Sequence, residues 1–299
     1  MGLRISDRAQ FSGAAPAALG GASAATFSCR VRVEPGAVPV AVNAPLWGID
    51  SGRCFALSGN TNWGFPSLKF SLLASNGSAY AFGFNYIPGR SYHIAATWDA
   101  ANSRQVFYLD GVVAGTAASA LSLQTILAGN AIRLGSPTAA LGASFSISDC
   151  RVWAGIALDA AAIRSIRDGS AVAPEMRHDL LISWRALAGP DGAPAATGDP
   201  GLADAVDGVA LSASGAGVAA WSSDPLAFVA PMATAARVLK SGRTIAFFFS
   251  DPVTGKPSNA AAISSHPTIS VNGGAPIALA NPAFTTSGNS FPFALYPLP

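Results

Sequence analysis

The chain has 299 residues and a formal net charge of +2; 50% of its residues are hydrophobic and 11% are charged. This length predicts one large β domain with a smaller one, or two or three domains of ordinary size, and the hydrophobic content is enough to build packed cores. Neither a basic block nor an apolar run of about 18 residues occurs, which argues against a nucleic-acid partner and against a membrane-spanning segment.

The first half of the chain has the pattern of an antiparallel sandwich, in which short alternating runs are separated by Gly, Pro, Asn and Asp. One such run is TFSCRVRVEP, residues 26–35. Because successive strand residues point to opposite faces, we expect its apolar face to comprise Phe27, Cys29, Val31 and Val33.

The cysteines stand at positions 29, 54 and 150, and an odd number at these spacings is neither a disulfide framework nor a metal site. We interpret them as small buried residues. Cys29 and Cys150 could pair if their strands are neighbours, which the sequence does not establish.

Residues 92–116, YHIAATWDAANSRQVFYLDGVVAGT, predict a meander of three strands. The first turn runs from Asp99 to Asn102, and Asp110-Gly111 is a two-residue turn that needs positive φ. The residues expected to alternate inward are Ile94, Ala96, Trp98, Phe107 and Leu109.

Residues 157–169, ALDAAAIRSIRDG, predict one short helix. Asp159 is placed to cap its N-terminus, and Leu158 and Ile163 are spaced to form a hydrophobic staple. Ile163 and Ile166 share a face, and Gly169 ends the helix.

The sequence predicts a first domain over 1–225, with a loop-rich closing segment at 170–225, and a linker at 226–232. Alternation resumes over 233–299 with turn signals at 241–242 and 272–273, which predicts a small immunoglobulin-like β-sandwich. Such sandwiches take about 100 residues, so we expect this one to be incomplete. The proline-rich tail FPFALYPLP is unsuited to the interior of a sheet.

The meander, with residues 26–35 and 145–169, resembles the laminin G-like, or concanavalin A-like, family. The resemblance extends in outline over residues 1–225 and implies an all-β fold, with two antiparallel sheets packed face to face as a jelly roll. It also implies binding of glycans, proteins or steroids, with calcium at a sheet edge in many members, or a role as a spacer in adhesins or as a part of phage virions. The C-terminal segment resembles bacterial immunoglobulin-like modules less closely.

Glucanases of the same superfold present two carboxylates across a cleft, about 5 Å apart in a retaining enzyme. The two glutamates here, Glu34 and Glu175, do not lie in the Glu-x-Asp-x-x-Glu motif that these enzymes use, and no Gly-x-Ser-x-Gly elbow occurs. In the family that the chain resembles, the position of His93 is a structural strand position. Neither His178 nor His266 has an obvious partner, although a Cys–His dyad of distant residues stays open. We therefore expect no enzymatic activity.

The chain has no His-x-x-x-His or Cys-x-x-Cys spacing, so no cofactor is required by the sequence. Calcium is the one ion with candidate ligands, because it takes oxygen atoms from loops. These candidates are Asp99, Asn102, Asp199, Asp204 and Asp207. The alternative is that these side chains simply form turns.

Glycan recognition needs an aromatic ring with amides nearby, and two segments have that composition. SGNTNWGFP, residues 58–66, supplies Asn60, Asn62, Trp63 and Phe65, and NYIPGR, residues 85–90, supplies Asn85, Tyr86 and Arg90. The alternative for Trp63 is a plug over the sandwich edge. Trp98, Trp153 and Trp184 are predicted to be core residues. The sequence pattern does not decide whether Trp47 and Trp221 are buried or exposed.

Two functions remain open at this level. The first is a non-catalytic binding or adhesion module that recognises a glycan or protein surface. The second is a structural component of an assembly, such as a phage tail, fibre or capsid decoration, in which the apolar tail mediates homo-oligomer or larger contacts. The N-terminus lacks the apolar core of a signal peptide. The two functions imply an extracellular or cell-surface location, reached after signal removal or by another route, or a virion.

Overall fold

The computed structural model divides into two units, Met1–Phe228 and Val229–Pro299, and each is described by itself. Their boundary falls within the predicted 226–232 linker, and the predicted domain limits stay a prediction. The described residues are 2–6, 8–19, 22–34, 44–49, 53–58, 67–73, 79–86, 89–118, 131–135, 144–169, 179–184, 189–203, 206, 209–214, 216–224, 226, 233–238, 244–254, 268–269, 277–278 and 290–297.

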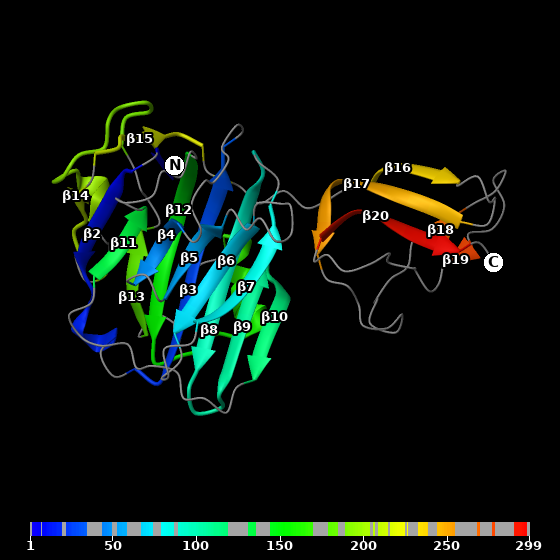
Figure 1. Ribbon diagram of the computed structural model, residues 1–299, viewed down its shortest axis with the longest axis horizontal. Coiled ribbons are helices and arrows are strands. Elements are labelled where there is room, and N and C mark those ends of the chain that lie inside the picture. Colours follow the sequence, from blue (N-terminus) through cyan, green and yellow to red (C-terminus); the bar gives the residue numbers. More distant parts are fainter. Residues whose placement is uncertain are drawn as a thin grey trace. The chain divides into compact units, whose positions relative to one another are not determined.

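The first unit is a sandwich of two antiparallel sheets, as the sequence predicts (Figure 1). The first sheet has eight strands, seven of them in one continuous path. Their order is β10 (Val112–Ala118), β9 (Arg104–Leu109), β8 (Ser91–Asp99), β3 (Ala24–Val33), β12 (Phe145–Ala154), β1 (Gly2–Ile5) and β15 (Ala219–Ser222), and β13 (Leu180–Trp184) pairs with β12.

The second sheet has seven strands and includes four consecutive ones, β4 to β7. Their order is β14 (Ser212–Ser214), β2 (Gln10–Ala14), β11 (Ala131–Gly135), β4 (Ala44–Ile49), β5 (Arg53–Ser58), β6 (Ser67–Leu73) and β7 (Ala79–Asn85). Two short 3-10 turns, η1 (Ala17–Leu19) and η3 (Pro200–Leu202), lie in the connections.

The main core fills the space between the two sheets, and the predicted inner face of β3 lies in it. Trp47 of β4 is fully buried and links the sheets, because its ring meets Phe27 of β3 at 6.0 Å and Trp184 of β13 at 6.2 Å, both edge to face. The predicted core positions of Trp98, Trp153 and Trp184 are confirmed. Trp47 and Trp221, which the sequence leaves unassigned, are also buried.

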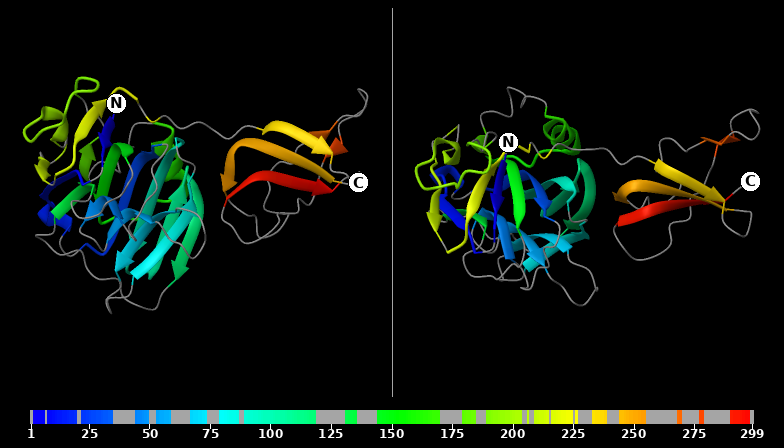
Figure 2. Two further views of the ribbon diagram at one scale, coloured as in Figure 1. Left: turned by 45° about the horizontal axis from the view of Figure 1, so that its top comes forward. Right: turned by 90° about the horizontal axis from the view of Figure 1, so that it is seen from above.

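The helix α1 (Ala160–Arg167) lies on the outer face of the eight-stranded sheet (Figure 2). A second apolar cluster is buried beneath it. Ile163 and Ile166 pack there against residues of β8, β9 and β12, together with Leu158. The Asp159 carboxylate accepts a 2.8 Å hydrogen bond from the Ala162 N–H, so the predicted cap is confirmed. Because both faces of β12 are covered, all ten of its residues are buried.

The predicted meander is present as β8, β9 and β10. Asp110 and Gly111 form its second turn with φ of 50° and 77°, the left-handed conformation that the Asp-Gly pair favours. A Cβ on Gly111 would lie 2.8 Å from Arg164 Cγ, so a larger residue would also collide with the helix. Arg167 of that helix donates to the Asp110 carbonyl at 2.7 Å, which fixes the helix over the turn.

The second unit contains a three-stranded and a two-stranded antiparallel sheet. The first has the order β16 (Ala233–Val238), β17 (Thr244–Thr254), β20 (Ser290–Pro297), and the second pairs β18 (Thr268–Ile269) with β19 (Ile277–Ala278). The strand pairs flanking 241–242 and 272–273 agree with the two predicted hairpins. The proline-rich tail supplies β20 at one edge of its sheet. The immunoglobulin-like assignment stays a prediction.

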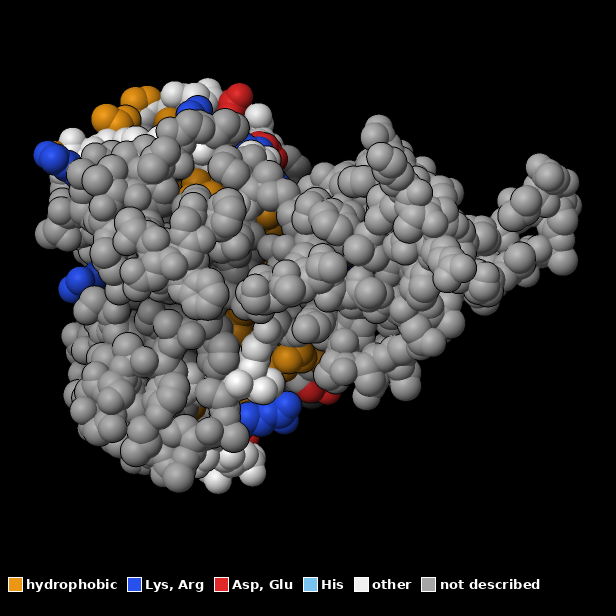
Figure 3. All heavy atoms as spheres, turned by 45° about the vertical axis from the view of Figure 1, so that its right-hand side comes forward, with side chains coloured by type: hydrophobic (Ala, Val, Ile, Leu, Met, Phe, Trp, Pro, Cys, Tyr) orange, Lys and Arg blue, Asp and Glu red, His pale blue; other side chains and the backbone are white. Residues whose placement is uncertain are grey.

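Within the described residues, no helix is long and apolar enough to cross a membrane. On the face drawn in Figure 3, the coloured Lys and Arg side chains stand at separate places, some of them close to coloured Asp or Glu side chains.

Replacing Trp47 tests the assignment of the core. Trp47→Ala removes the ring that contacts both Phe27 and Trp184, and we expect it to lower the free energy of unfolding by about 3–5 kcal/mol. The measurement is chemical denaturation followed by circular dichroism. Val218→Ala is the control, because Val218 is 64% exposed and its truncation should change stability by less than about 0.5 kcal/mol. Equal effects of the two variants would contradict this core.

Candidate functional site

The predicted sugar-binding segment lies mostly outside the described residues. This applies to Asn60, Asn62, Trp63 and Phe65. Asn85 is the last residue of β7, where its backbone pairs with Ser67 of β6. A binding role for these residues therefore stays a prediction.

Tyr86 and Arg90, the other two candidates in this group, have structural partners. Tyr86 belongs to the main core, and burial raises its pKa to about 12. Arg90 donates to an Asp110 carboxylate oxygen at 3.1 Å, and its guanidinium lies 4.7 Å from the centre of the Tyr92 ring. Both side chains thus contact neighbours in the fold, and a binding role for either stays a prediction.

The candidate calcium ligands that are described form turns. Asp99 accepts hydrogen bonds from the backbone N–H of Asn102 at 3.1 Å and from its side-chain amide at 2.6 Å, and the side-chain bond lowers the pKa of Asp99. Asp199 accepts from the Ala196 N–H at 2.8 Å and from the Trp221 indole at 3.2 Å.

Asp204 and Asp207 lie outside the described residues. No group of three or more His, Cys, Asp or Glu side chains in the described part of the chain could hold a metal ion. Calcium takes six to eight oxygen ligands, including backbone carbonyls, and its binding here stays a prediction.

Glu34, the described glutamate, is held in a structural network. Its Oε1 accepts hydrogen bonds from the guanidinium of Arg32 at 3.1 and 3.0 Å and from the hydroxyl of Ser146 at 2.6 Å. Arg32 also binds Asp224, so the network ties β3 to β12 and to the chain after β15. These bonds engage the Glu34 carboxylate within the fold. Glu175 lies outside the described residues.

A group of polar side chains is buried on the outer face of the eight-stranded sheet. Strand register places Arg30 of β3 between His93 of β8 and Ser148 of β12. Arg151 is fully buried and forms a two-pronged pair with Asp149, at 2.7 and 2.9 Å, while Arg30 Nε lies 3.6 Å from the same carboxylate. Arg30 also donates to the carbonyl of Arg167 at the C-terminal end of α1. This group therefore anchors the helix end.

His93 is 1% exposed, and neither of its ring nitrogens has a hydrogen-bond partner. Burial lowers its pKa to about 3; Asp149 acts in the opposite direction, and Arg30, Arg151 and Arg167 lower the pKa further. The imidazole is consequently neutral at physiological pH. Because the ring is buried, a substrate could not reach it, and no hydrogen-bond partner is placed to exchange a proton with it. Both observations agree with a structural role.

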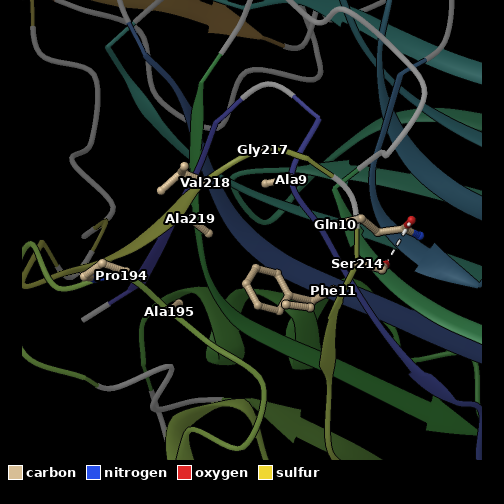
Figure 4. A pocket seen from close by; sticks show the side chains of 10 residues that line it. Ala9, Gln10, Phe11, Pro194, Ala195, Ser214, Gly217, Val218 and Ala219 are labelled. Carbon is tan, nitrogen blue, oxygen red and sulfur yellow. Dashed lines mark hydrogen bonds between the residues drawn. The ribbon is translucent and has the colours of Figure 1, made fainter.

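One pocket opens where the edges of the two sheets meet (Figure 4). It lies between β14, the last strand of the seven-stranded sheet, and β15, the last strand of the eight-stranded one. Its volume is about 230 Å³, and the residues that line it are all uncharged. Pockets for drug-sized ligands have volumes of roughly 300–1,000 Å³, so this smaller pocket has room for one group the size of a ring.

The pocket has an apolar wall and one polar side. Phe11 of β2 and the methyl groups of Ala195 and Ala219 form the wall. The Gln10 side chain extends away from this wall and meets Ser214 at the rim, where the Ser214 hydroxyl lies 3.5 Å from Gln10 Oε1 (Figure 4). That separation is at the outer limit for a hydrogen bond, so a ligand hydroxyl could replace it at small cost. Sequence reasoning missed this site, because Gln10 and Ser214 are 204 positions apart and no local pattern relates them.

The comparisons with known proteins agree with this architecture. A family model described as the concanavalin A-like lectin/glucanases superfamily matches residues 9–164, slightly more than half of the chain. The chain belongs to this superfamily. No curated protein matches the chain.

Solved structures show the same fold at low sequence identity. A protein from Bacteroides ovatus, provisionally described as carbohydrate-binding, is 16% identical with a TM-score of 0.55; the alignment covers 76% of this chain and 61% of that protein. This member of the concanavalin A-like superfamily thus spans less than two thirds of that relative, and the likeness establishes the fold alone.

Two further matches are looser. The heptameric SAP-like pentraxin of Limulus polyphemus has a TM-score of 0.38 at 16% identity, over 55% of this chain and 81% of the pentraxin. The receptor-binding domain of a botulinum neurotoxin C/D mosaic has a TM-score of 0.44 at 10% identity, over 56% of this chain and 42% of that one. Neither bears on function, and nothing in these comparisons favours the virion alternative.

The depressed pKa of His93 predicts a loss of stability in mild acid. The folded chain keeps the imidazole neutral down to about pH 3, whereas the unfolded chain takes up a proton near the ordinary value of 6.5. The contribution of His93 to the free energy of unfolding is therefore fully present above pH 6.5, and it is lost as the pH falls from 6.5 toward 3. Between pH 7 and pH 4.5 the loss attributable to His93 is about 2–3 kcal/mol.

Urea denaturation at a series of pH values measures this loss, and His93→Gln should remove most of the pH dependence in that window. His178→Gln serves as the control, since it also deletes one histidine. An unchanged slope in His93→Gln would show that other groups cause the acid sensitivity.

Proposed function

We propose that the chain is a non-catalytic carbohydrate-recognition module that works outside the cell or at its surface. The observation that carries the proposal is the pocket between β14 and β15. Its lining is uncharged, with an apolar wall and a neighbouring amide and hydroxyl, the arrangement that orients a neutral ligand in a protein pocket. Superfamily membership and the fold shared with the Bacteroides ovatus protein support a sugar as that ligand.

The same geometry argues against cleavage of the bound sugar. The pocket contains no carboxylate, and glycoside hydrolysis needs two of them on opposite sides of the bond. Glu34 is engaged by Arg32 and Ser146. We therefore propose that a neutral saccharide inserts one ring, or one apolar substituent of a ring, into the pocket. The saccharide is then released without any bond having been cleaved.

The segment 58–66 is proposed as a second contact surface, on its composition alone. Trp63 would supply a stacking face, and Asn60 and Asn62 would supply hydrogen bonds to hydroxyl groups. Phe65 and Asn85 would extend this surface.

Filling the pocket tests the first surface. Ala195→Leu places a larger side chain against the apolar wall, so binding to glycans identified by an array of neutral saccharides should weaken at least about tenfold, or 1.4 kcal/mol. Ala196→Leu is the matched control, because Ala196 is exposed and does not line the pocket. A variant that folds and binds as the wild type would rule the pocket out as the site.

Removing the indole tests the second surface. Trp63→Ala should reduce affinity for the same glycans by roughly tenfold if Trp63 stacks on a sugar ring, and should leave the unfolding midpoint unchanged. Titration calorimetry provides the affinity and calorimetric scanning provides the midpoint. A large fall in the midpoint without a specific loss of affinity would indicate instead that Trp63 is a plug at the sandwich edge.

A further inference from the structure

Two cysteines from distant parts of the chain face one another inside the sandwich. Register pairs Ser28 with Arg151 and Arg30 with Ser148, so Cys29 of β3 lies opposite the two-residue bulge formed by Asp149 and Cys150 of β12. Both cysteines belong to the same apolar core, are at most 1% exposed, and are free thiols. They are therefore neighbours across one strand pair and on the same face of the sheet.

This position brings the two thiols into contact, because the side chain of Cys150 is hydrogen-bonded to that of Cys29. Disulfides join Cα atoms about 4.4–6.8 Å apart, a range that neighbouring antiparallel strands reach. Cys54, the third cysteine, lies on β5 of the other sheet, paired with Gly48 and Ser71. The register thus favours one pairing, 29 with 150, over the other two.

We propose that Cys29 and Cys150 form a disulfide that links β3 to β12 when the chain folds in an oxidising compartment. Two thiols are oxidised and a disulfide of the glutathione class is reduced: one thiolate attacks it, a mixed disulfide forms and one glutathione leaves. The second cysteine then displaces the other glutathione, so one protein disulfide and two glutathione thiols result.

The bond must form before the core closes. Both sulfur atoms are buried in the folded sandwich. Burial raises the pKa of the Cys150 thiol well above its usual value, and the neighbouring Cys29 side chain raises the pKa of Cys150 further. The thiolate is the reactive species, so the folded, reduced protein should resist the oxidant. The redox state is consequently set during folding and then retained.

Refolding the full chain in two glutathione buffers tests the proposal. The chain is unfolded and reduced, then refolded either with reduced glutathione alone or with a mixture of reduced and oxidised glutathione, and its thiols are alkylated in denaturant. We expect alkylation at positions 29, 54 and 150 in the first arm and at Cys54 alone in the second, with a 29–150 linked peptide in the mass spectrum. The oxidised form should melt several degrees higher, since the bond restricts the unfolded chain.

Variants and a third arm complete the test. Cys54→Ala should keep the rise in melting temperature, and Cys29→Ala and Cys150→Ala should each abolish it. Oxidised glutathione added to the folded, reduced protein should produce no bond over the time that suffices during refolding. Three alkylated cysteines after oxidative refolding, or a linkage that includes Cys54, would overturn the pairing, and rapid oxidation of the folded protein would overturn its timing.

Discussion

The pairing of β12 with three other strands determines how the rest of the first unit is arranged. One edge of this strand carries β3 along most of its length, while the other edge is shared, with β1 beside residues 145–147 and β13 beside residues 150–153. The bulge at Asp149, with its φ of 50°, lies between these two segments. Because β1 in turn pairs with β15, this strand also positions one wall of the pocket.

Burial on both faces of β12 explains the chemistry found there. The inner face contributes Ile147, Cys150 and Val152 to the core. The outer face is covered by α1 and carries the buried ion pair of Arg151 with Asp149. A charged side chain in such a place needs a partner, which Asp149 provides for Arg151. The ionisable groups of this region therefore maintain the fold, and the pocket proposed for recognition lies at the sandwich edge, where its lining is uncharged.

Much of the sandwich could be predicted from local pattern. Alternation identified the inner face of β3, the Asp-Gly pair identified the meander turn, and Asp159 with the isoleucines at 163 and 166 identified the helix, because each depends on residues close together in the sequence. Pairings such as β2 with β14 could not be predicted, since the strand Ser212–Ser214 is short, its residues are exposed, and it has no apolar face to mark it. The buried position of Trp47 was missed for a related reason, as its partners Phe27 and Trp184 come from other strands.

The candidate site was less predictable than the fold. Composition directed attention to the aromatic and amide residues near Trp63 and Asn85, whereas Tyr86 and Arg90 prove to have partners within the fold. The pocket depends on the long-range pairing of β2 with β14 and on the packing of two sheet edges, which leave no signature in a single stretch of sequence.

The central claim is that this superfamily member holds a sugar and leaves it intact. In the direct measurement, the purified chain is immobilised and the polysaccharide with the highest affinity is bound to it. New reducing ends are then quantified over a long incubation. The account predicts that the polysaccharide is retained and eluted at its original length. Release of shorter saccharides with new reducing ends, or failure to retain any polysaccharide, would contradict it.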